Sequence, residues 1–285
     1  MSASDAWTRL GAVAPADLTN ATLELHWAAQ FIAAAGQSLA EPREDDSHRA
    51  MTWDASRREF MGEPFAGAYP FRVGLRPADL TLLLLDQTDE PLGSLPLAGK
   101  TREEGHEWLM SGLANYMGEL PEIGRPEYDL PPHPVHDGAP FSEGQRNELG
   151  TLSALYESTA ALLGEIVDGH ESASEVRCWP HHFDIATLVT VERGEDSHAS
   201  KTIGIGMAPM GGGYESWYWY VTPWPHPKLD TLPTLDGPGA WHTEGWVGAV
   251  LSGDEVVEAE GVFREAVVRK FVDVSVGAAL SLLEA

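Results

Sequence analysis

Residues 203–227 read IGIGMAPMGGGYESWYWYVTPWPHP, and this stretch decides the fold class. β-Branched and aromatic residues on both sides of a glycine-rich turn are typical of two strands joined as a hairpin. We therefore predict strands at residues 202–207 and 216–222, with a preceding strand at residues 181–192. Turns this short cannot hold the crossover that joins parallel strands, so the sheet is expected to be mostly antiparallel.

Helices are predicted before and after these strands rather than between them. Apolar spacing and capping residues predict helices over residues 19–35, 101–117, 142–168 and 255–283. Further short strands are expected at residues 51–54, 71–76, 80–86 and 246–251. Grouped helices with a mostly antiparallel sheet define an α+β fold. The order helix, strands, helix occurs twice, which suggests an internal pseudo-repeat.

A proline-rich segment separates the two halves of the chain. Residues 119–142 hold six of the 20 prolines, Pro121 and Pro126 among them. This density favours an extended connection over a helix or a central strand. We expect an N-terminal half of residues 1–141 and a C-terminal half of residues 142–285, with one continuous domain as the alternative.

Composition excludes several classes of function. The formal charge is −26, so phosphate backbones would be repelled and no nucleic-acid partner is expected. The longest apolar stretch, residues 80–85, is too short to span a bilayer, and Asp5 argues against a signal peptide. Cys178 is the only cysteine, so no internal disulfide can form. We expect an acidic, cytoplasmic protein, and its few lysines suggest a bacterial source.

The C-terminal half holds the aromatic residues from which a binding site is most easily built. Strand alternation predicts Tyr218 and Tyr220 on one face of the sheet and Trp217 and Trp219 on the other. One of these faces is expected to line a cleft, although packing in the core is the alternative for all of them. The predicted ligand-binding residues are Trp179, Tyr218, Tyr220, Trp224 and, from the helix at residues 19–35, Gln30.

His182 and Asp184 are the candidate catalytic residues. Both are expected on one face of the strand predicted at residues 181–192. Such a pair can bind a metal or act as a base with its orienting carboxylate, and metal-assisted hydrolysis would suit it. The alternative is that one of the two neighbouring histidines is buried and hydrogen-bonded and the other exposed. The residues considered as metal ligands, for a divalent ion such as zinc, are His182, His242 and His26, with His48 and Asp46 as further candidates.

Two other motifs have simpler structural explanations. Gly99-Lys100-Thr101 resembles the end of a phosphate-binding loop, but the preceding glycine is displaced by one position. Thr101 is better explained as the cap of the following helix, in a capping box with Glu104. Cys178 lies beside a basic residue, which favours a reactive thiolate, but a lone cysteine is more often a small buried residue.

Four motifs resemble an uncharacterised bacterial protein family of similar length, a domain of unknown function. They are WPHHFDIATL at residues 179–188, IGIGMAP followed by GGGY at 203–214, YWYVTPWPHP at 218–227 and WHxxGW at 241–246. LHWAAQ at residues 25–30 and EPREDDSH at 41–48 belong to the same pattern, so the resemblance covers most of the chain. The family has no known activity, so the resemblance implies no reaction, cofactor or catalytic residue.

Three functions are open on the sequence alone. The first is a small-molecule-binding protein, which as an enzyme would be a metal-dependent hydrolase. The second is a non-catalytic interaction module that presents an aromatic surface to a protein partner. The third is a scaffold in which every aromatic side chain is buried. The sequence does not determine the oligomeric state.

Overall fold

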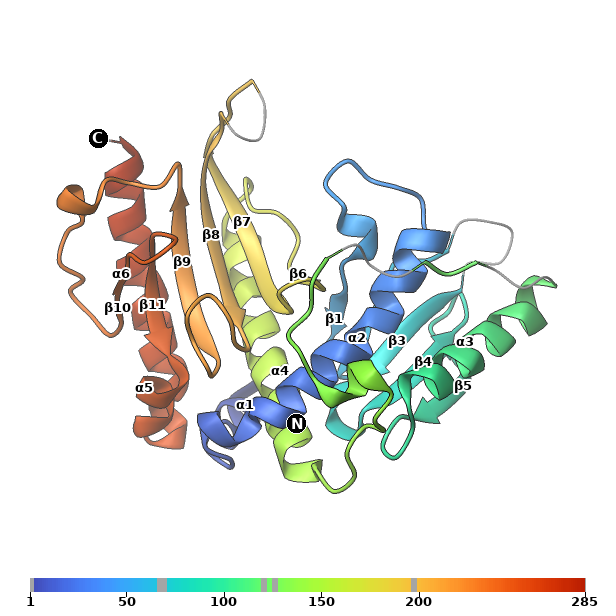
Figure 1. Ribbon diagram of the computed structural model, residues 1–285. Coiled ribbons are helices and arrows are strands. Elements are labelled where there is room, and N and C mark those ends of the chain that lie inside the picture. The colour runs from blue at the N-terminus through green and yellow to red at the C-terminus, as the bar shows by residue number, and fades with distance from the viewer. Residues whose placement is uncertain (1–2, 66–70, 119–121, 125–127, 196–198, 285) are drawn as a thin grey trace. The chain divides into compact units, whose positions relative to one another are not determined.

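The computed structural model describes residues 3–65, 71–118, 122–124, 128–195 and 199–284 (Figure 1). Pro121 and Pro126 lie outside these residues. The chain forms two compact units. The N-terminal unit comprises residues 18–153 and 177–183, and the C-terminal unit comprises residues 1–17, 154–176 and 184–285. Helices and antiparallel sheets make up both units, which confirms the predicted α+β class. The units are not consecutive segments of the chain, unlike the expected halves 1–141 and 142–285.

The sheet of the N-terminal unit is an antiparallel meander. Its strands are adjacent in the order in which they follow along the chain. β4 is buried along its whole length, as its sequence TLLLL requires. The strands are β1 (Thr52–Asp54), β2 (Glu59–Met61), β3 (Arg72–Arg76), β4 (Thr81–Leu85) and β5 (Pro91–Pro96). β2 and β5 were not expected from the sequence.

Two helices pack on this sheet. α2 (Thr19–Leu39) contacts β3, and α3 (Arg102–Met117) contacts β4 and β5. A Cβ atom at Gly105 would lie 2.6 Å from Cζ of Phe31, so glycine allows the two helices to approach closely. The hydroxyl of Thr101 accepts from the backbone N–H of Glu104, and the predicted capping box is confirmed.

The sheet of the C-terminal unit is also antiparallel. Its strands lie in the order β10 (Ala240–His242), β11 (Gly248–Ser252), β9 (Tyr218–Trp224), β8 (Lys201–Ala208) and β7 (Asp184–Glu192). β7 begins only at Asp184. Residues 181–183 form a turn in which Phe183 has φ of 58°, so the strand predicted to include His182 is wrong there. β6 (Arg177–Trp179) belongs to the N-terminal unit, where Cys178 pairs with Met51.

Helices cover one face of this second sheet. α6 (Arg264–Glu284) packs on β8, β9 and β11, and Trp7 of α1 (Ala3–Arg9) stacks on Trp219. α4 (Arg146–Gly169) begins in the N-terminal unit and continues in the C-terminal one. None of the helices in the described ranges combines the length and hydropathy that a membrane crossing requires.

The single helix predicted at residues 255–283 is wrong. The structure has a short α5 (Gly253–Glu258), a break and then α6. The guanidinium of Arg264 donates to the backbone oxygens of Trp7, Thr8 and Ala259. The buried side chain of Arg264 thus supplies hydrogen-bond donors to carbonyl groups at the C-terminal ends of α1 and α5. These hydrogen bonds stabilise the break between α5 and α6. The short 3₁₀ segments are Pro15–Leu18, Ser47–Arg49, Pro77–Asp79, Pro134–Asp137, Leu229–Thr231 and Gly261–Phe263.

Candidate functional site

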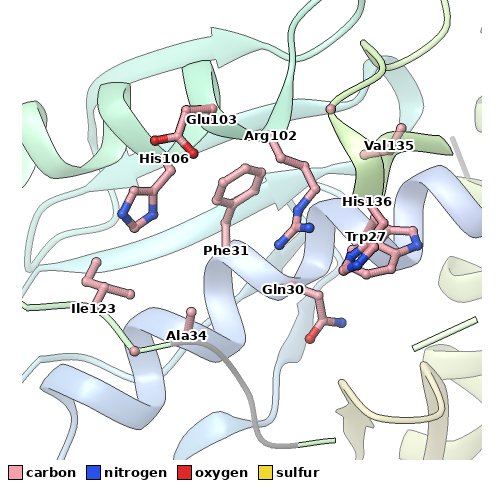
Figure 2. A pocket seen from close by; sticks show the side chains of 12 residues that line it. Trp27, Gln30, Phe31, Ala34, Arg102, Glu103, His106, Ile123, Val135 and His136 are labelled. Atoms are coloured by element: carbon pink, nitrogen blue, oxygen red, sulfur yellow. The ribbon is translucent and has the colours of Figure 1, made fainter. Parts of the chain in front are cut away.

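A pocket of about 270 Å³ lies in the N-terminal unit, between α2, α3 and the proline-rich segment that follows α3 (Figure 2). α2 lines it with Trp27, Gln30, Phe31 and Ala34. Residues at this spacing share one face of a helix, which explains why all four side chains reach the same hollow. The apolar part of this face is continuous with the core of the unit, since Trp27 and Phe31 are both buried.

The described residues of the proline-rich segment, 122–124 and 128–138, border the pocket, and their contacts with α2 run antiparallel to that helix. Proline has no backbone N–H and cannot complete a strand ladder, so side chains hold much of this segment in place. From Asn20 to Ser38 along α2, the residues of the segment that the helix contacts come progressively earlier in the chain. The contacts are Asn20 Oδ1 with His133 Nε2 (3.2 Å), Trp27 Nε1 with the Pro131 oxygen (3.1 Å), Gln30 Oε1 with the Tyr128 hydroxyl (2.7 Å) and Ser38 Oγ with the Gly124 N–H (2.9 Å).

Basic and aromatic side chains meet on the pocket wall. The guanidinium carbon of Arg102 lies 4.5 Å from the ring centroid of Trp27, a cation–π arrangement. The ring of His136 lies 5.1 Å from the same indole. Glu103 and His106 extend the wall along the first turns of α3 (Figure 2). The pocket therefore combines flat apolar surface with groups that can donate hydrogen bonds.

Gln30 and His26 fasten the segment 177–183 to α2. The Gln30 amide donates to the backbone oxygens of His26 and Pro180, both at 3.0 Å. His26 Nε2 donates to the same Pro180 oxygen at 2.8 Å, and its ring stacks on Phe183. The structure thus places the predicted ligand Gln30 on a pocket wall, but its amide N–H groups are already used. The predicted metal ligand His26 has a structural role.

Burial keeps His26 uncharged. Desolvation lowers the pKa of this imidazole from 6.5 to about 4, opposed by the hydrogen bond to Pro180 and reinforced weakly by His182 and His181. A neutral imidazole whose Nε2 carries the proton matches the observed donation to a carbonyl. His181 and His182 are exposed, with ring centroids 4.4 Å apart, and Trp179 touches His181 edge-on.

Asp184 and Tyr220 meet on the face of the C-terminal sheet opposite Trp219. The Tyr220 hydroxyl donates to Asp184 Oδ2 at 2.5 Å. A Cβ at Gly206 would lie 2.6 Å from that hydroxyl oxygen, so the tyrosine reaches across a position that only glycine leaves open. The structure brings together these two predicted site residues. His182 belongs to the N-terminal unit, since the chain passes between the units after Phe183.

His242 lies on β10, at the other edge of this sheet. Its Nε2 donates to the Glu244 oxygen at 2.7 Å, and its Nδ1 accepts from the Tyr214 hydroxyl at 3.1 Å, so both ring nitrogens are used. β10 and β7 are four inter-strand spacings of about 4.8 Å apart, or roughly 19 Å. Asp184 and His242 are therefore not in direct contact. Tyr220, which bonds Asp184, and Tyr214, which bonds His242, both pack against a buried cluster that includes Tyr218.

A metal centre finds no support in the described part of the chain. It contains no group of three or more His, Cys, Asp or Glu side chains that could hold a metal ion. His48 is buried and its Nδ1 accepts from the Arg43 N–H, while the exposed Asp46 pairs with Arg49. The side chains of His48 and Asp46 thus make contacts within the loop at residues 43–49. The thiol of Cys178 is buried beside the Phe183 oxygen.

The aromatic residues of β9, and Trp217 just before it, differ greatly in exposure. Trp217 and Trp219 are 2% and 0% exposed, and Tyr218 is 6% exposed. Burial, together with the nearby Asp184 carboxylate, raises the pKa of Tyr218 to about 12. Trp224 is 39% exposed, and Tyr220 is partly buried. The predicted alternation of faces is confirmed for Tyr218, Trp219 and Tyr220 by their register on β8 and β11.

A second hollow, of about 540 Å³, lies within the C-terminal unit. It is bounded by the last turn of α4, by α6 and by β7 and β8, and its lining is mainly aliphatic, including Ile166, Ile203 and Val272. His170 and Asp273 are its two ionisable residues. None of the residues predicted as a site from the sequence lines it.

The basic residues of the α2–α3 pocket were not predicted from the sequence. His106 and His136 lie in no motif and Arg102 lies only within the capping box of α3, so the regular spacing of Trp27, Gln30, Phe31 and Ala34 is the sequence signal for this wall. No family model matches the chain, and no match was found among curated proteins or solved structures. The family resemblance of the WPHHFD and WHxxGW motifs stays a prediction.

Proposed function

We propose that this chain is a small-molecule-binding protein whose ligand occupies the α2–α3 pocket. The observation that carries the proposal is a hollow walled by the rings of Trp27 and Phe31 and edged by Arg102, His106 and His136. Ligand sites typically combine mostly apolar walls with a few polar groups that set orientation. Drug-sized molecules need about 300–1,000 Å³, so a pocket of about 270 Å³ suits a molecule built around one ring.

The proposal is for binding and names no reaction. Metal-assisted hydrolysis does not enter it, because the described residues hold no group suited to a metal. His182 and Asp184 are assigned to different units, and the Asp184 carboxylate accepts the Tyr220 hydroxyl. Neither residue lines the pocket on which the proposal rests.

The test uses fluorine resonances from 5-fluorotryptophan incorporated at the ten tryptophan positions. Trp27→Phe identifies the Trp27 signal by its loss. Four one-ring compounds, benzoate, benzamide, benzylamine and phenol, are then titrated separately. We expect at least one to shift the Trp27 resonance saturably while the Trp224 resonance stays unchanged. Absence of any such response at millimolar concentration would overturn the proposal.

A pocket-filling variant supplies the control. Ala34→Phe places a ring in the hollow and is expected to abolish the response. Ala114→Phe adds the same ring to α3 away from the pocket lining and is expected to preserve it. Undiminished binding in Ala34→Phe would place the ligand elsewhere. Urea unfolding of both variants shows whether each remains folded.

A protein-interaction module is the second candidate, favoured by one observation. Leu188 and Trp224 are 45% and 39% exposed and lie on the same face of the C-terminal sheet. Exposed Trp residues are frequent anchors of interfaces. For a second copy as partner, sedimentation velocity would show association that rises with concentration and weakens in Leu188→Ser. A constant monomeric mass in the wild type would exclude self-association through this face.

A further inference from the structure

The second hollow, of about 540 Å³ in the C-terminal unit, has a floor of aliphatic side chains. β8 contributes Ile203 and Ile205, which are both 1% exposed, and α6 contributes the buried Val272. No Phe, Tyr or Trp among the described residues lines it, in contrast to the α2–α3 pocket. Such walls suit an aliphatic chain, because they offer an aromatic ring none of the stacking partners that stabilise it.

Polar contacts fix the walls beside both ends of the hollow. Arg269 of α6 forms an ion pair with Glu165 of α4 at 2.8 Å, just before the lining residues of both helices. Beyond the last of them, the Lys201 ammonium donates to the Leu283 backbone oxygen at 2.8 Å and joins β8 to α6. Between these contacts, residues 272–280 of α6 span about 12 Å. The hollow is therefore matched to one short chain.

The segment after α4 places polar groups at the mouth of the hollow. Its backbone pairs with β7, because the Thr190 N–H donates to the Ser172 oxygen at 3.1 Å. His170 and Ser172 of this segment are exposed and line the hollow, as does the exposed Asp273 of α6. A buried aliphatic floor below an exposed polar rim matches an amphiphile whose head stays in water.

Gly277 enlarges the hollow from the side of α6. Glycine within a helix is less favourable than alanine, because it gives up more backbone freedom on folding. A Cβ atom built at Gly277 would have no atom of the described chain within 4 Å, unlike the one at Gly105. No close contact within the described chain accounts for this glycine. The space that it leaves belongs to the hollow.

Water is a poor occupant of a hollow with aliphatic walls. A buried water molecule needs about two to four polar partners, which the floor does not offer. An apolar group that displaces weakly held water gains affinity. We infer that this hollow is a second binding site, and that it holds the chain of a short, freely soluble aliphatic amphiphile with its head at His170 and Ser172. The inference goes beyond the function proposed for the α2–α3 pocket and does not depend on it.

Isoleucine methyl resonances report the two hollows separately. Of the six isoleucines, Ile166, Ile203 and Ile205 line this hollow, and Ile123 lines the α2–α3 pocket. The full chain, ¹³C-labelled at these methyl groups, is titrated singly with 1-butanol, 1-hexanol and 1-octanol. We expect saturable shifts at Ile203 and Ile205 while Ile123 stays unchanged. Shifts confined to Ile123, or no saturable shift up to the solubility limits, would overturn the second site and leave the α2–α3 proposal standing.

Chain length is the decisive variable, because the alcohols share one head group. Each methylene that is fully buried strengthens binding by about fourfold, so 1-hexanol is expected to bind at least about tenfold more tightly than 1-butanol. An affinity that does not rise with chain length would overturn burial of a chain in this hollow.

Gly277→Leu fills the hollow and is expected to weaken 1-hexanol binding at least tenfold. Gly164→Leu is the matched control, because a Cβ at Gly164 also has no described atom within 4 Å, but this residue lies outside the lining. The control is expected to bind 1-hexanol as the wild type does. Undiminished binding in Gly277→Leu would overturn the location of the chain. Urea unfolding shows whether both variants fold, and if Gly277→Leu does not, the alcohol series in the wild type decides.

Phosphatidylcholine vesicles separate a freely soluble ligand from a lipid held in a bilayer. The wild-type protein is expected to stay in the supernatant when the vesicles are sedimented. Co-sedimentation that Gly277→Leu abolishes would assign the hollow to a membrane lipid and overturn the inference of a freely soluble ligand.

Discussion

The aromatic strand β9 and the α2–α3 pocket present the same kinds of side chain in opposite ways. On β9, Trp219 is fully buried against Trp7, and the Tyr220 hydroxyl donates a hydrogen bond to the Asp184 carboxylate. In the pocket, Trp27 is buried as well, but its ring contacts Arg102 and His136 and lines a hollow. A high content of aromatic residues is thus found both in the core and around the pocket. Only the neighbours of each ring show to which of the two it belongs.

The difference lies in how each element meets its neighbours. β9 has a strand on either side and helices on one face, so its side chains have continuous neighbours. α2 meets α3 closely at Gly105, and beyond that contact α2 is bordered by described residues of the proline-rich segment, which form no strand and only one short 3₁₀ turn. Protein interiors are close-packed, so a hollow of about 270 Å³ marks a place where neighbouring side chains do not meet.

The largest effect on stability is expected at Trp219, the largest fully buried side chain of β9. Trp219→Ala should lower the free energy of unfolding by about 3–5 kcal/mol, because it leaves a cavity beside Trp7. Urea unfolding followed by far-UV circular dichroism measures the change. Trp224→Ala, on the same strand but 39% exposed, should cost less than about 1 kcal/mol. Similar losses in the two variants would contradict the contrast drawn between buried and exposed residues of β9.

An intermediate effect on the free energy of unfolding is expected at His26, a residue of α2, the helix that lines the pocket. Its pKa is about 4 in the folded chain and 6.5 as the ordinary value. Above pH 6.5 neither state binds the proton, so His26 adds no pH dependence there. As the pH falls below 6.5 only the unfolded state is protonated, and stability decreases by about 2 kcal/mol at pH 5.

His26→Gln isolates this contribution, because glutamine can keep a donor for the Pro180 oxygen while having no proton to gain. Between pH 7.5 and pH 5.0 the wild type should lose about 2 kcal/mol more of its free energy of unfolding than the variant does. Urea titrations at both pH values provide the comparison. Parallel losses in the two proteins would show that His26 is not desolvated as the structure implies.

The smallest of the three effects is expected on the open face of β9. Tyr220→Phe removes the hydroxyl that donates to Asp184 and should lower the free energy of unfolding by about 1–2 kcal/mol. Denaturant unfolding at pH 7 measures it. The Trp27 fluorine resonance and the binding of the one-ring compounds should be unchanged, since Tyr220 is not part of the pocket. A loss of this binding would contradict the assignment of the site to α2 and α3.

Local signals predicted many of the elements. Thr101 and Glu104 specify the start of α3 through bonds made within four residues, and the alternating residues of β8 and β9 specify their faces. The predictions failed where the local conformation depends on a partner far away in the sequence. The turn at residues 181–183 is attached to α2 through Pro180, His26 and Gln30, and Arg264 stabilises the break before α6 by binding the end of α1.

The sequence by itself determined the α+β class, the antiparallel pairing of β8 with β9 and the capping box at the start of α3, because propensity, periodicity and turn chemistry act over a few residues. Only the tertiary structure decided where a hollow would lie. Arg102 and His136 are 75 and 109 positions away from Trp27 in the chain, and no local pattern links them. Whether a ring is core or pocket wall depends on what long-range packing leaves unfilled.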